Sequence, residues 1–433
     1  MQLYSLFLKY PIICTDSRNC PQDSIFFALK GENFNANAYA KMALENGCKY
    51  AVVDEAEYAI DDRFVLVDNV LESFQDLAKH HRKQLKTKII GITGTNGKTT
   101  SKELIAAVLC EKYHILYTQG NLNNHIGVPL TLLKLKSEHE IAVIEMGANH
   151  LGEIKILAEI ACPDYGIITN VGKAHLEGFG SFEGIMKTKA ELYDFIKNEG
   201  KLIFKNKDNQ FLLKMANDAG LTSDKIVDYS LNTENKNCQI WGEITAKSPF
   251  LEMNCIVNQS DAVIIKTKLV GTYNAENVLA AVTIGNYFGI EIEKIKKGLE
   301  NYTPQNNRSQ LTITENNKLI VDAYNANPTS MAAAIMNFAE MDVSPKVLIL
   351  GDMLELGDLA IQEHQLVVDL LKKQNLTEVF LVGKFFKQIS TDFCCFETVE
   401  LLMHQLEIQP IKNSYVIIKG SRGIKLENVL GLL

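Results

Sequence analysis

The segment most suggestive of chemistry is a glycine-rich run, G-I-T-G-T-N-G-K-T-T, at residues 91–100. Glycines let backbone N–H groups turn toward phosphate oxygens, Lys98 can reach the outer phosphates, and the hydroxyl of Thr99 can bind magnesium. The general phosphate-loop pattern has a glycine where this chain has Ile92, so only the core G-x-x-G-K-T matches. The run predicts a site for MgATP phosphates, with a glycine-rich turn lacking a ligand as the alternative. The expected contacts are Gly94, Thr95, Asn96, Gly97, Lys98, Thr99 and Thr100.

Two further polar residues follow apolar runs and are candidate metal ligands. Glu145 ends the run I-A-V-I-E, and His175 lies in N-V-G-K-A-H, just past the next apolar run. A carboxylate at that edge can hold the magnesium that accompanies ATP. The alternatives are a solvated glutamate at a strand end and a loop histidine with protein partners.

The apolar pattern predicts the elements that position these residues. Residues 89–93 are expected as a strand and 100–112 as a helix, because the pattern changes from a continuous apolar run to helical spacing. Strands at 141–145 and 165–170, with a helix at 151–159 between them, continue the alternation. Such alternation is typical of parallel strands with crossover helices.

The flanking regions predict two further domains. A helix is expected at residues 68–86, and short strands at 232–267 suggest an antiparallel flap on the central domain. Toward the C-terminus, residues 347–351, 379–383 and 415–420 each read as a strand that meets a glycine. We therefore expect an α/β fold of three domains: a small α/β domain (1–86), a central P-loop-type α/β ATPase domain (87–307) and a Rossmann-like domain (308–433).

Composition excludes several classes of protein. The 433 residues are 46% hydrophobic and 22% charged, with a net charge of −8 and no long run of one sign, which argues against a general nucleic-acid or anionic-membrane binder. Nine cysteines include no C-x-x-C pair, and Cys14 and Cys20 are too far apart in sequence for a zinc knuckle. Reduced thiols and a cytoplasmic location are expected. No export signal or membrane span is predicted.

Ordered motifs along nearly the whole chain resemble the Mur ligases, the ADP-forming amino-acid ligases of peptidoglycan precursor synthesis. They are G-T-N-G-K-T-T (94–100), E-M-G-A-N-H (145–150), N-V-G-K-A-H-L-E-G-F-G-S (170–181), N-A-E-N-V-L-A-A (274–281), N-R-S-Q (307–310), D-A-Y-N-A-N-P-T-S-M (322–331), L-G-D-M-L-E-L-G (350–357) and K-G-S-R-G (419–423). Within the family, residues 322–331 and G-N-L-N-N-H-I-G-V-P (120–129) resemble the branch that adds D-alanyl-D-alanine to UDP-N-acetylmuramoyl-tripeptide. The resemblance implies these two substrates, ATP and an acyl-phosphate intermediate, and a monomer is expected. A different Mur ligase step and an ATP-driven binding module are the alternatives.

The resemblance also implies roles for the ATP and metal residues. Lys98 and the loop backbone would bind phosphates, Thr99 and Glu145 one magnesium, and His175 a second. Lys189 matches the family lysine that carbon dioxide carbamylates, and the resulting carboxylate would help to position magnesium; an exposed helix lysine is the alternative, and Lys187 competes for the assignment. The expected catalytic residues are Lys98, His175, Lys189 and Arg308.

The remaining implied contacts concern the nucleotides and the dipeptide. Asn274 and Asn277 would contact the adenine, Arg308 the γ-phosphate and Asp322 the ribose, although Tyr273 stands where the family often has histidine. The expected substrate contacts are Ser17 and Arg18 for the uridine nucleotide, Asn121, Asn123 and Asn124 for the muropeptide, and Asn325, Asn327 and Ser330 for the dipeptide. Whether the third residue of the tripeptide is diaminopimelate or lysine does not follow from the sequence.

Overall fold

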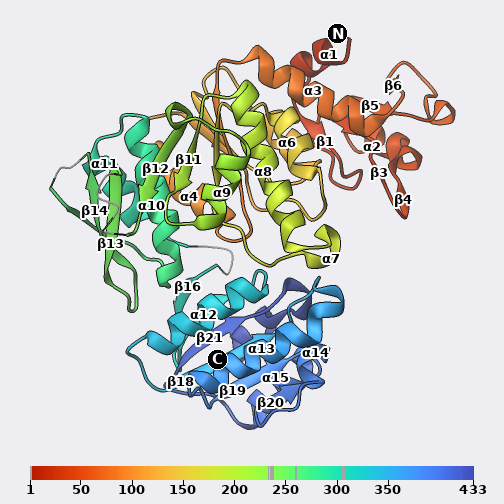
Figure 1. Ribbon diagram of the computed structural model, residues 1–433. Helices are drawn as coiled ribbons and strands as arrows, with labels where there is room; N and C mark the ends of the chain where they lie inside the picture. The colour runs from red at the N-terminus through yellow and green to blue at the C-terminus, as the bar shows by residue number, and fades with distance from the viewer. Residues whose placement is uncertain (1, 233, 235–237, 259–260, 305–307) are drawn as a thin grey trace.

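The computed structural model describes residues 2–232, 234, 238–258, 261–304 and 308–433. The chain folds around three larger sheets, taken in sequence order, with the central one between the other two (Figure 1). The expected limit at residue 307, Asn307 of the N-R-S-Q motif and parts of the 232–267 segment lie outside the described residues. None of the described helices combines the length and the apolar character needed to cross a membrane.

The N-terminal sheet is small and parallel, with the order β1-β2-β5-β6. Its helices cover a core that includes Phe26 and Val53, which are almost fully buried. The elements are α1 (Gln2–Lys9), β1 (Ile13–Cys14), β2 (Ile25–Phe27), β3 (Lys30–Gly31), β4 (Phe34–Asn35), α2 (Ala40–Glu45), β5 (Tyr50–Val53), β6 (Phe64–Leu66) and α3 (Val70–Gln84). The predicted helix at 68–86 is therefore α3, which starts after its N-cap residue Asn69.

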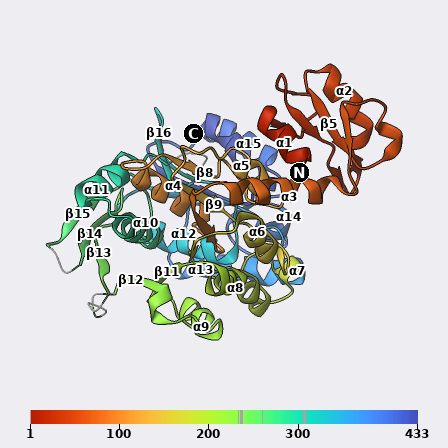
Figure 2. The ribbon, with the colours of Figure 1, turned by 90° about the horizontal axis from the view of Figure 1, so that it is seen from above.

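Helix α3 contacts both the N-terminal and the central part of the chain. Its Phe74 ring lies 5.0 Å from that of Phe27 on β2. Near its other end, the Arg82 guanidinium is 2.9 Å from the Asp164 carboxylate, just before a strand of the central sheet. Figure 2 shows α3 reaching from the N-terminal sheet to the central one. The helix is thus a shared element rather than the edge of one domain.

The central sheet has nine strands in the order β15-β14-β13-β12-β11-β10-β7-β9-β8. From β8 to β13 the neighbours are parallel, as the alternation predicted, and β13, β14 and β15 are antiparallel. The predicted antiparallel strands are therefore part of the central domain, and they extend its sheet. The strands are β7 (Lys88–Thr93), β8 (Ile115–Tyr117), β9 (Ile141–Glu145), β10 (Tyr165–Ile168), β11 (Leu202–Asn206), β12 (Ile226–Ser230), β13 (Ile240–Ala246), β14 (Glu252–Val257) and β15 (Val263–Lys266).

Strand β7 leads directly into the phosphate loop, and it is buried on both of its faces. Ile90 and Ile92 face one apolar cluster, which includes residues of α4 and α10, whereas Ile89 faces another, which includes residues of α6 and α8. Alternate residues of a strand point to opposite faces, so a continuous apolar run suits a strand covered on both sides. The central helices are α4 (Lys98–Leu109), α5 (Gly127–Leu132), α6 (Glu153–Ala161), α7 (Leu176–Phe179), α8 (Phe182–Glu199), α9 (Gln210–Asp218), α10 (Ala275–Tyr287) and α11 (Ile292–Asn301).

The C-terminal sheet has the order β16-β17-β21-β18-β19-β20, with only β16 antiparallel. The three strands predicted from glycine-ended apolar runs are its adjacent strands β21, β18 and β19. The elements are β16 (Gln310–Ile313), β17 (Lys318–Asp322), α12 (Pro328–Glu340), β18 (Lys346–Gly351), α13 (Ala360–Lys373), β19 (Val379–Val382), α14 (Lys384–Lys387), β20 (Cys394–Phe396), α15 (Val399–Ile408) and β21 (Tyr415–Lys419).

Candidate active site

A cavity of ≈ 980 Å³ lies where β7, β9 and β10 of the central sheet end and where the C-terminal domain faces them. Parallel α/β sheets bind ligands at this edge. It is lined by most of the predicted residues: Thr95, Asn96, Gly97, Lys98, Thr99, Thr100, Asn121, Asn123, Asn124, Glu145, His175, Asn274, Asn277, Arg308, Asp322, Asn325, Asn327 and Ser330. The predicted residues outside its lining are Ser17, Arg18, Gly94 and Lys189.

The loop from residue 94 to 97 is held tightly between β7 and α4. Gly94 has φ +143°, and a Cβ there would collide with the Thr169 hydroxyl; Gly97 has φ +77°, and a Cβ there would lie 2.7 Å from Asn277 Oδ1. Lys98 Nζ donates to the carbonyl oxygens of Gly94 (2.8 Å) and Thr95 (3.0 Å). Both glycines are thus required by space as well as by backbone conformation.

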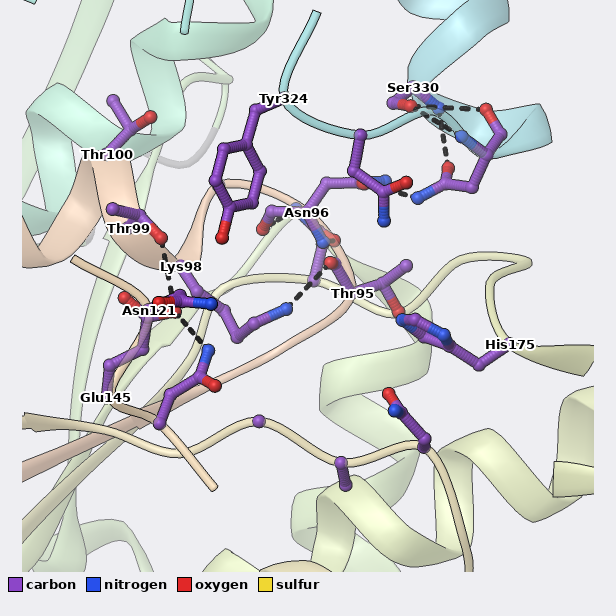
Figure 3. A pocket seen from close by; sticks show the side chains of 18 of the residues that line it. Thr95, Asn96, Lys98, Thr99, Thr100, Asn121, Glu145, His175, Tyr324 and Ser330 are labelled. Atoms are coloured by element: carbon purple, nitrogen blue, oxygen red, sulfur yellow. Dashed lines mark hydrogen bonds between the residues drawn. The ribbon is translucent and has the colours of Figure 1, made fainter. Parts of the chain in front are cut away.

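Glu145 and Thr99 meet at the floor of the cavity (Figure 3). The glutamate is 1% exposed, and its Oε1 accepts hydrogen bonds from Thr99 Oγ1 (3.1 Å) and Asn123 Nδ2 (2.8 Å). Its Oε2 accepts none from the residues that the structure describes. A buried carboxylate oxygen without a donor, beside a hydroxyl, fits a hard cation such as magnesium.

Lys102 supports this corner, and sequence reasoning missed it. Its side chain is fully buried on α4, and Nζ donates to the Thr118 carbonyl at 2.6 Å. The same Nζ lies 2.9 Å from Glu103 Oε1 and 3.9 Å from Glu145 Oε2. The signal in the sequence was a lysine one helical turn after Lys98, on the apolar face of the predicted helix.

His175 lies at the side of the cavity in a left-handed conformation, with φ +50°. Its Nδ1 is 2.5 Å from Glu355 Oε2, and this hydrogen bond lowers the pKa of Glu355. Nearby, Lys173 Nζ is 2.7 Å from Glu363 Oε1. An ion pair and a histidine–carboxylate contact therefore join the central and C-terminal domains beside the cavity, and a metal role for His175 stays a prediction.

Lys189 is buried on α8, at 3% exposure, whereas Lys187 is exposed. Burial lowers the pKa of Lys189 to about 7, and repulsion by Lys98 adds to this. Its Nζ lies 5.4 Å from the centre of the Phe179 ring. The lowered pKa of Lys189 makes its amine neutral, and hence nucleophilic, near neutral pH, and of the two lysines only Lys189 is buried.

Asn274 and Asn277 form a hydrogen-bonded chain below the phosphate loop. Asn277 Nδ2 donates to Asn274 Oδ1 (3.0 Å), Asn274 Nδ2 donates to the Val270 carbonyl (2.9 Å), and Ser101 Oγ donates to Asn277 Oδ1 (2.9 Å). Through Ser101, these amides contact the first turn of α4. Their contact with adenine stays a prediction.

The C-terminal wall of the cavity presents Arg308, Tyr324 and Asp322. The Arg308 guanidinium lies over the Tyr324 ring, 3.8 Å from its centre, and Asp322 Oδ2 is 2.6 Å from Lys419 Nζ. Stacking fixes the plane of a guanidinium while leaving its N–H donors free for an anion. Tyr324 and Lys419 were not among the predicted site residues.

Asn327 and Ser330 form the capping box of helix α12. Asn327 Oδ1 accepts from the Ser330 N–H (2.9 Å), and the Asn327 N–H donates to Ser330 Oγ (3.1 Å). The Asn327 amide also donates to Asn96 Oδ1 at 2.8 Å, which joins this helix start to the phosphate loop. Asn325 Oδ1 accepts from the Ala326 N–H. Their contact with a dipeptide stays a prediction.

The N-terminal residues lie apart from the cavity lining. Arg18 is bound to Asp16 at 2.9 Å and its side chain is 83% exposed, while Ser17 is buried and its carbonyl accepts from Asn46 Nδ2 at 2.8 Å. The N-terminal region contributes instead through α3, whose polar face sequence reasoning missed. Its cavity-lining polar side chains, with the N-cap residue, are Asn69, Glu72 and Gln75.

Comparison with known proteins gives consistent matches. Residues 92–285 match the Mur ligase middle domain, and 307–422 match the family described as Mur ligase, glutamate ligase domain. The UDP-N-acetylmuramoyl-tripeptide--D-alanyl-D-alanine ligase of Bacillus subtilis is 35% identical over 96% of this chain and 92% of its own length. The corresponding ligase of Escherichia coli is 34% identical over 97% and 93%. A crystal structure of MurF from Acinetobacter baumannii is 31% identical, with a TM-score of 0.85 over 97% of this chain and 92% of its own.

Proposed function

The chain belongs to the Mur ligase family, and we propose from this premise that it joins D-alanyl-D-alanine to UDP-N-acetylmuramoyl-tripeptide, with ATP converted to ADP and phosphate. This is the last amino-acid addition to the peptidoglycan precursor. The observation that carries the proposal is the pairing of Thr99 with buried Glu145 beside the phosphate loop, in a cavity that the C-terminal domain closes.

The reaction must activate a carboxylate, because an amine cannot expel oxide from it. ATP supplies the phosphoryl group, so that the tripeptide carboxylate becomes an acyl phosphate and phosphate becomes the leaving group. The dipeptide amine then attacks the acyl carbon. Lys98 and the stacked guanidinium of Arg308 hold the anionic phosphoryl oxygens and stabilise the charge that develops on them.

The residues around Glu145 fit a magnesium ion. Thr99 and Glu145 would hold it through oxygen atoms, with His175 serving a second ion. Magnesium bound there would neutralise phosphate charge. The support for this assignment is the Glu145 oxygen that receives no hydrogen bond from the described residues.

We assign the carbamylated lysine to Lys189. Its buried amine, with a pKa of about 7, can react with carbon dioxide, which forms an N–C bond and releases a proton. The protonated amine of Lys189 repels the Lys98 ammonium, whereas the negatively charged carbamate would attract it. Exposed Lys187 has no such environment.

The remaining contacts are proposed from the position of the residues in the fold. Asn121, Asn123 and Asn124 line the cavity on the side of α3 and would contact the muropeptide, while Ser17 and Arg18 would hold the uridine nucleotide in the N-terminal domain. The proposed nucleotide contacts are Asn274, Asn277 and Asp322, and the proposed dipeptide contacts are Asn325, Asn327 and Ser330.

Water must not reach the acyl phosphate, and the contacts between domains serve this purpose. The pairs Lys173–Glu363 and His175–Glu355 close one side of the cavity. We further propose that the protein acts as a monomer in the cytoplasm, a location that suits its nine free thiols.

A coupled assay of ADP release tests the function. ADP should appear only when UDP-tripeptide and D-alanyl-D-alanine are both present, and parallel reactions with the diaminopimelate and lysine tripeptides should identify the third residue. ADP release with UDP-dipeptide and free diaminopimelate or lysine would assign the chain to the preceding step. ADP release without either substrate would favour an ATP-driven binding module.

A further inference from the structure

Three cysteines of the N-terminal domain gather into one cluster. Cys14 ends β1, Cys20 lies in the loop between β1 and β2, and Cys48 precedes β5. Their Sγ atoms all lie within 4.8 Å of one another, and Cys14 and Cys48 are 4% and 5% exposed. The sequence spacing of Cys14 and Cys20 had argued against a zinc knuckle, but the parallel pairing of β1, β2 and β5 brings a third thiol to them.

The distances suit a shared metal ion better than a disulfide. Cys14 Sγ and Cys20 Sγ are 3.7 Å apart. A tetrahedral zinc ion with Zn–S bonds of about 2.3 Å holds its sulfur atoms about 3.8 Å apart, whereas a disulfide bond is about 2.0 Å long. The two thiols therefore already lie at the separation that a common zinc ion requires.

The thiols are protonated donors in this structure, and metal binding would exchange these hydrogen bonds for bonds to the metal. Cys14 Sγ donates to the Asp16 carbonyl (3.2 Å) and Cys20 Sγ to the Ser17 carbonyl (3.5 Å), and both hydrogen bonds would be lost when the thiols bind as thiolates. The Ser24 hydroxyl lies 3.1 Å from Cys48 Sγ. Among the described residues no fourth histidine, cysteine or carboxylate joins the group, which leaves one coordination position for water on the more open side of Cys20.

We propose that Cys14, Cys20 and Cys48 form a site for a thiophilic divalent cation of the zinc class. Three thiols bind one Zn²⁺ as thiolates, and their three protons pass to solvent. Such an ion would cross-link the ends of the 14–20 loop to the segment before β5, through side chains that take no part in the cavity.

The site would also fix the loop that carries Ser17 and Arg18. This consequence rests on the proposed function, because those two residues are assigned to the uridine nucleotide. Zinc should then lower the KM for UDP-tripeptide without changing the KM for ATP. Metal binding itself can be measured without any ligase activity, so the two proposals fail separately.

The experiment uses the full chain, reduced and freed of metal under anaerobic conditions. Zn²⁺ is titrated in competition with a chromophoric chelator, and Co²⁺ is used as a second probe because thiolate ligands give it a charge-transfer absorption. Cys20→Ser removes one proposed ligand from a half-buried loop. The matched control is Cys394→Ser, which alters an exposed thiol that also neighbours another cysteine.

The wild-type chain and Cys394→Ser should each bind one Zn²⁺ with equal affinity and show the Co²⁺–thiolate band. Loss of an outer-shell partner alone costs about 10–100-fold in metal affinity, so Cys20→Ser should bind at least about tenfold more weakly. Zn²⁺ should also protect Cys14, Cys20 and Cys48 of the wild-type chain from alkylation, a measurement that needs no variant to fold.

Three results would overturn the proposal. One is a wild-type chain that takes no Zn²⁺ from the chelator. Another is unchanged affinity in Cys20→Ser together with lost affinity in Cys394→Ser, which would place binding at the Cys394–Cys395 pair. The third is a Cys14–Cys20 disulfide, found by mass spectrometry, with all three thiols unprotected by Zn²⁺ in the reduced chain.

Discussion

Replacing Glu145 by glutamine separates the charge of this side chain from its shape. The amide oxygen of glutamine can still accept the hydrogen bonds from Thr99 Oγ1 and Asn123 Nδ2 that Oε1 accepts now. The amide nitrogen would take the place of Oε2, which receives no hydrogen bond from the described residues and lies 3.9 Å from Lys102 Nζ. The variant should therefore fold, while the cavity loses its buried negative charge.

The expected loss of activity follows from that charge. A buried carboxylate beside a hydroxyl is a strong ligand for magnesium, and a neutral amide is a weak one. Losing one preorganised electrostatic contact at a reacting centre costs about 2.7–4 kcal/mol, or about 100–1000-fold in kcat. We expect kcat to fall by that factor and the Mg²⁺ concentration for half-maximal activity to rise.

The assay is ADP release at saturating substrates over a range of Mg²⁺ concentrations. Glu103→Gln is the matched control, because Glu103 Oε1 is 2.9 Å from the same Lys102 Nζ but does not line the cavity. Its kcat should stay within about threefold of wild type because Glu103 does not line the cavity, whereas its melting temperature should fall because buried Lys102 loses an ion-pair partner. Melting temperatures of both variants report whether they fold.

Two outcomes would refute the reasoning. A folded Glu145→Gln enzyme with kcat near wild type and an unchanged Mg²⁺ dependence would remove Glu145 from the metal site. An equal loss in Glu103→Gln would mean that the effect passes through Lys102 and not through a bound cation.

The other predictions concern a lysine, a carboxyl group and a glycine. Lys189→Ala should nearly abolish turnover, and added short carboxylic acids should partly restore it; full activity of the variant would remove Lys189 from the site. Burial, with help from the Asp208 charge, raises the pKa of Glu276 to about 7, so this cavity-lining group is neutral below pH 7 and anionic above it. The KM for ATP should therefore rise between pH 6 and pH 8, and less so in Glu276→Gln; equal profiles would contradict this. Gly94→Ala should lower the melting temperature, because positive φ costs about 1–3 kcal/mol and the Cβ meets Thr169; an unchanged melting temperature would show that the loop can shift.

The features that could be predicted from sequence are those set by short, continuous patterns. A strand that is covered on both faces is apolar along its whole length, and the apolar run before Gly94 predicted β7 for this reason. Strand β7 and helix α4 lie where the pattern predicted them, apart from two to three residues at the ends of the helix. Glu145 was predicted for the same reason, since a polar residue that ends a buried strand lies at the binding edge of the sheet.

The features that could not be predicted depend on contacts between distant segments. The helical spacing signals that Lys102 lies on an apolar face, but it does not predict the Thr118 carbonyl that accepts its hydrogen bond or its position near Glu145. The position of Cys48 beside Cys14 and Cys20 follows only from the pairing of β2 with β5, which the sequence does not reveal. Periodicity reveals that a helix has a buried face, but it does not reveal that α3 is shared by two parts of the molecule.

That shared helix limits how the chain can be divided. A fragment that ends after α3 would expose the surface that now meets Leu135 and Asp164, including His81, whose Nε2 lies 2.9 Å from the Leu135 carbonyl. A fragment that begins after α3 would uncover the matching surface on α5 and α6. Any truncation meant to isolate the cavity must therefore keep residues 70–84 with the central sheet. Such a fragment would expose Phe74, which packs against Phe27 in the whole chain, so a polar substitution at Phe74 would be needed.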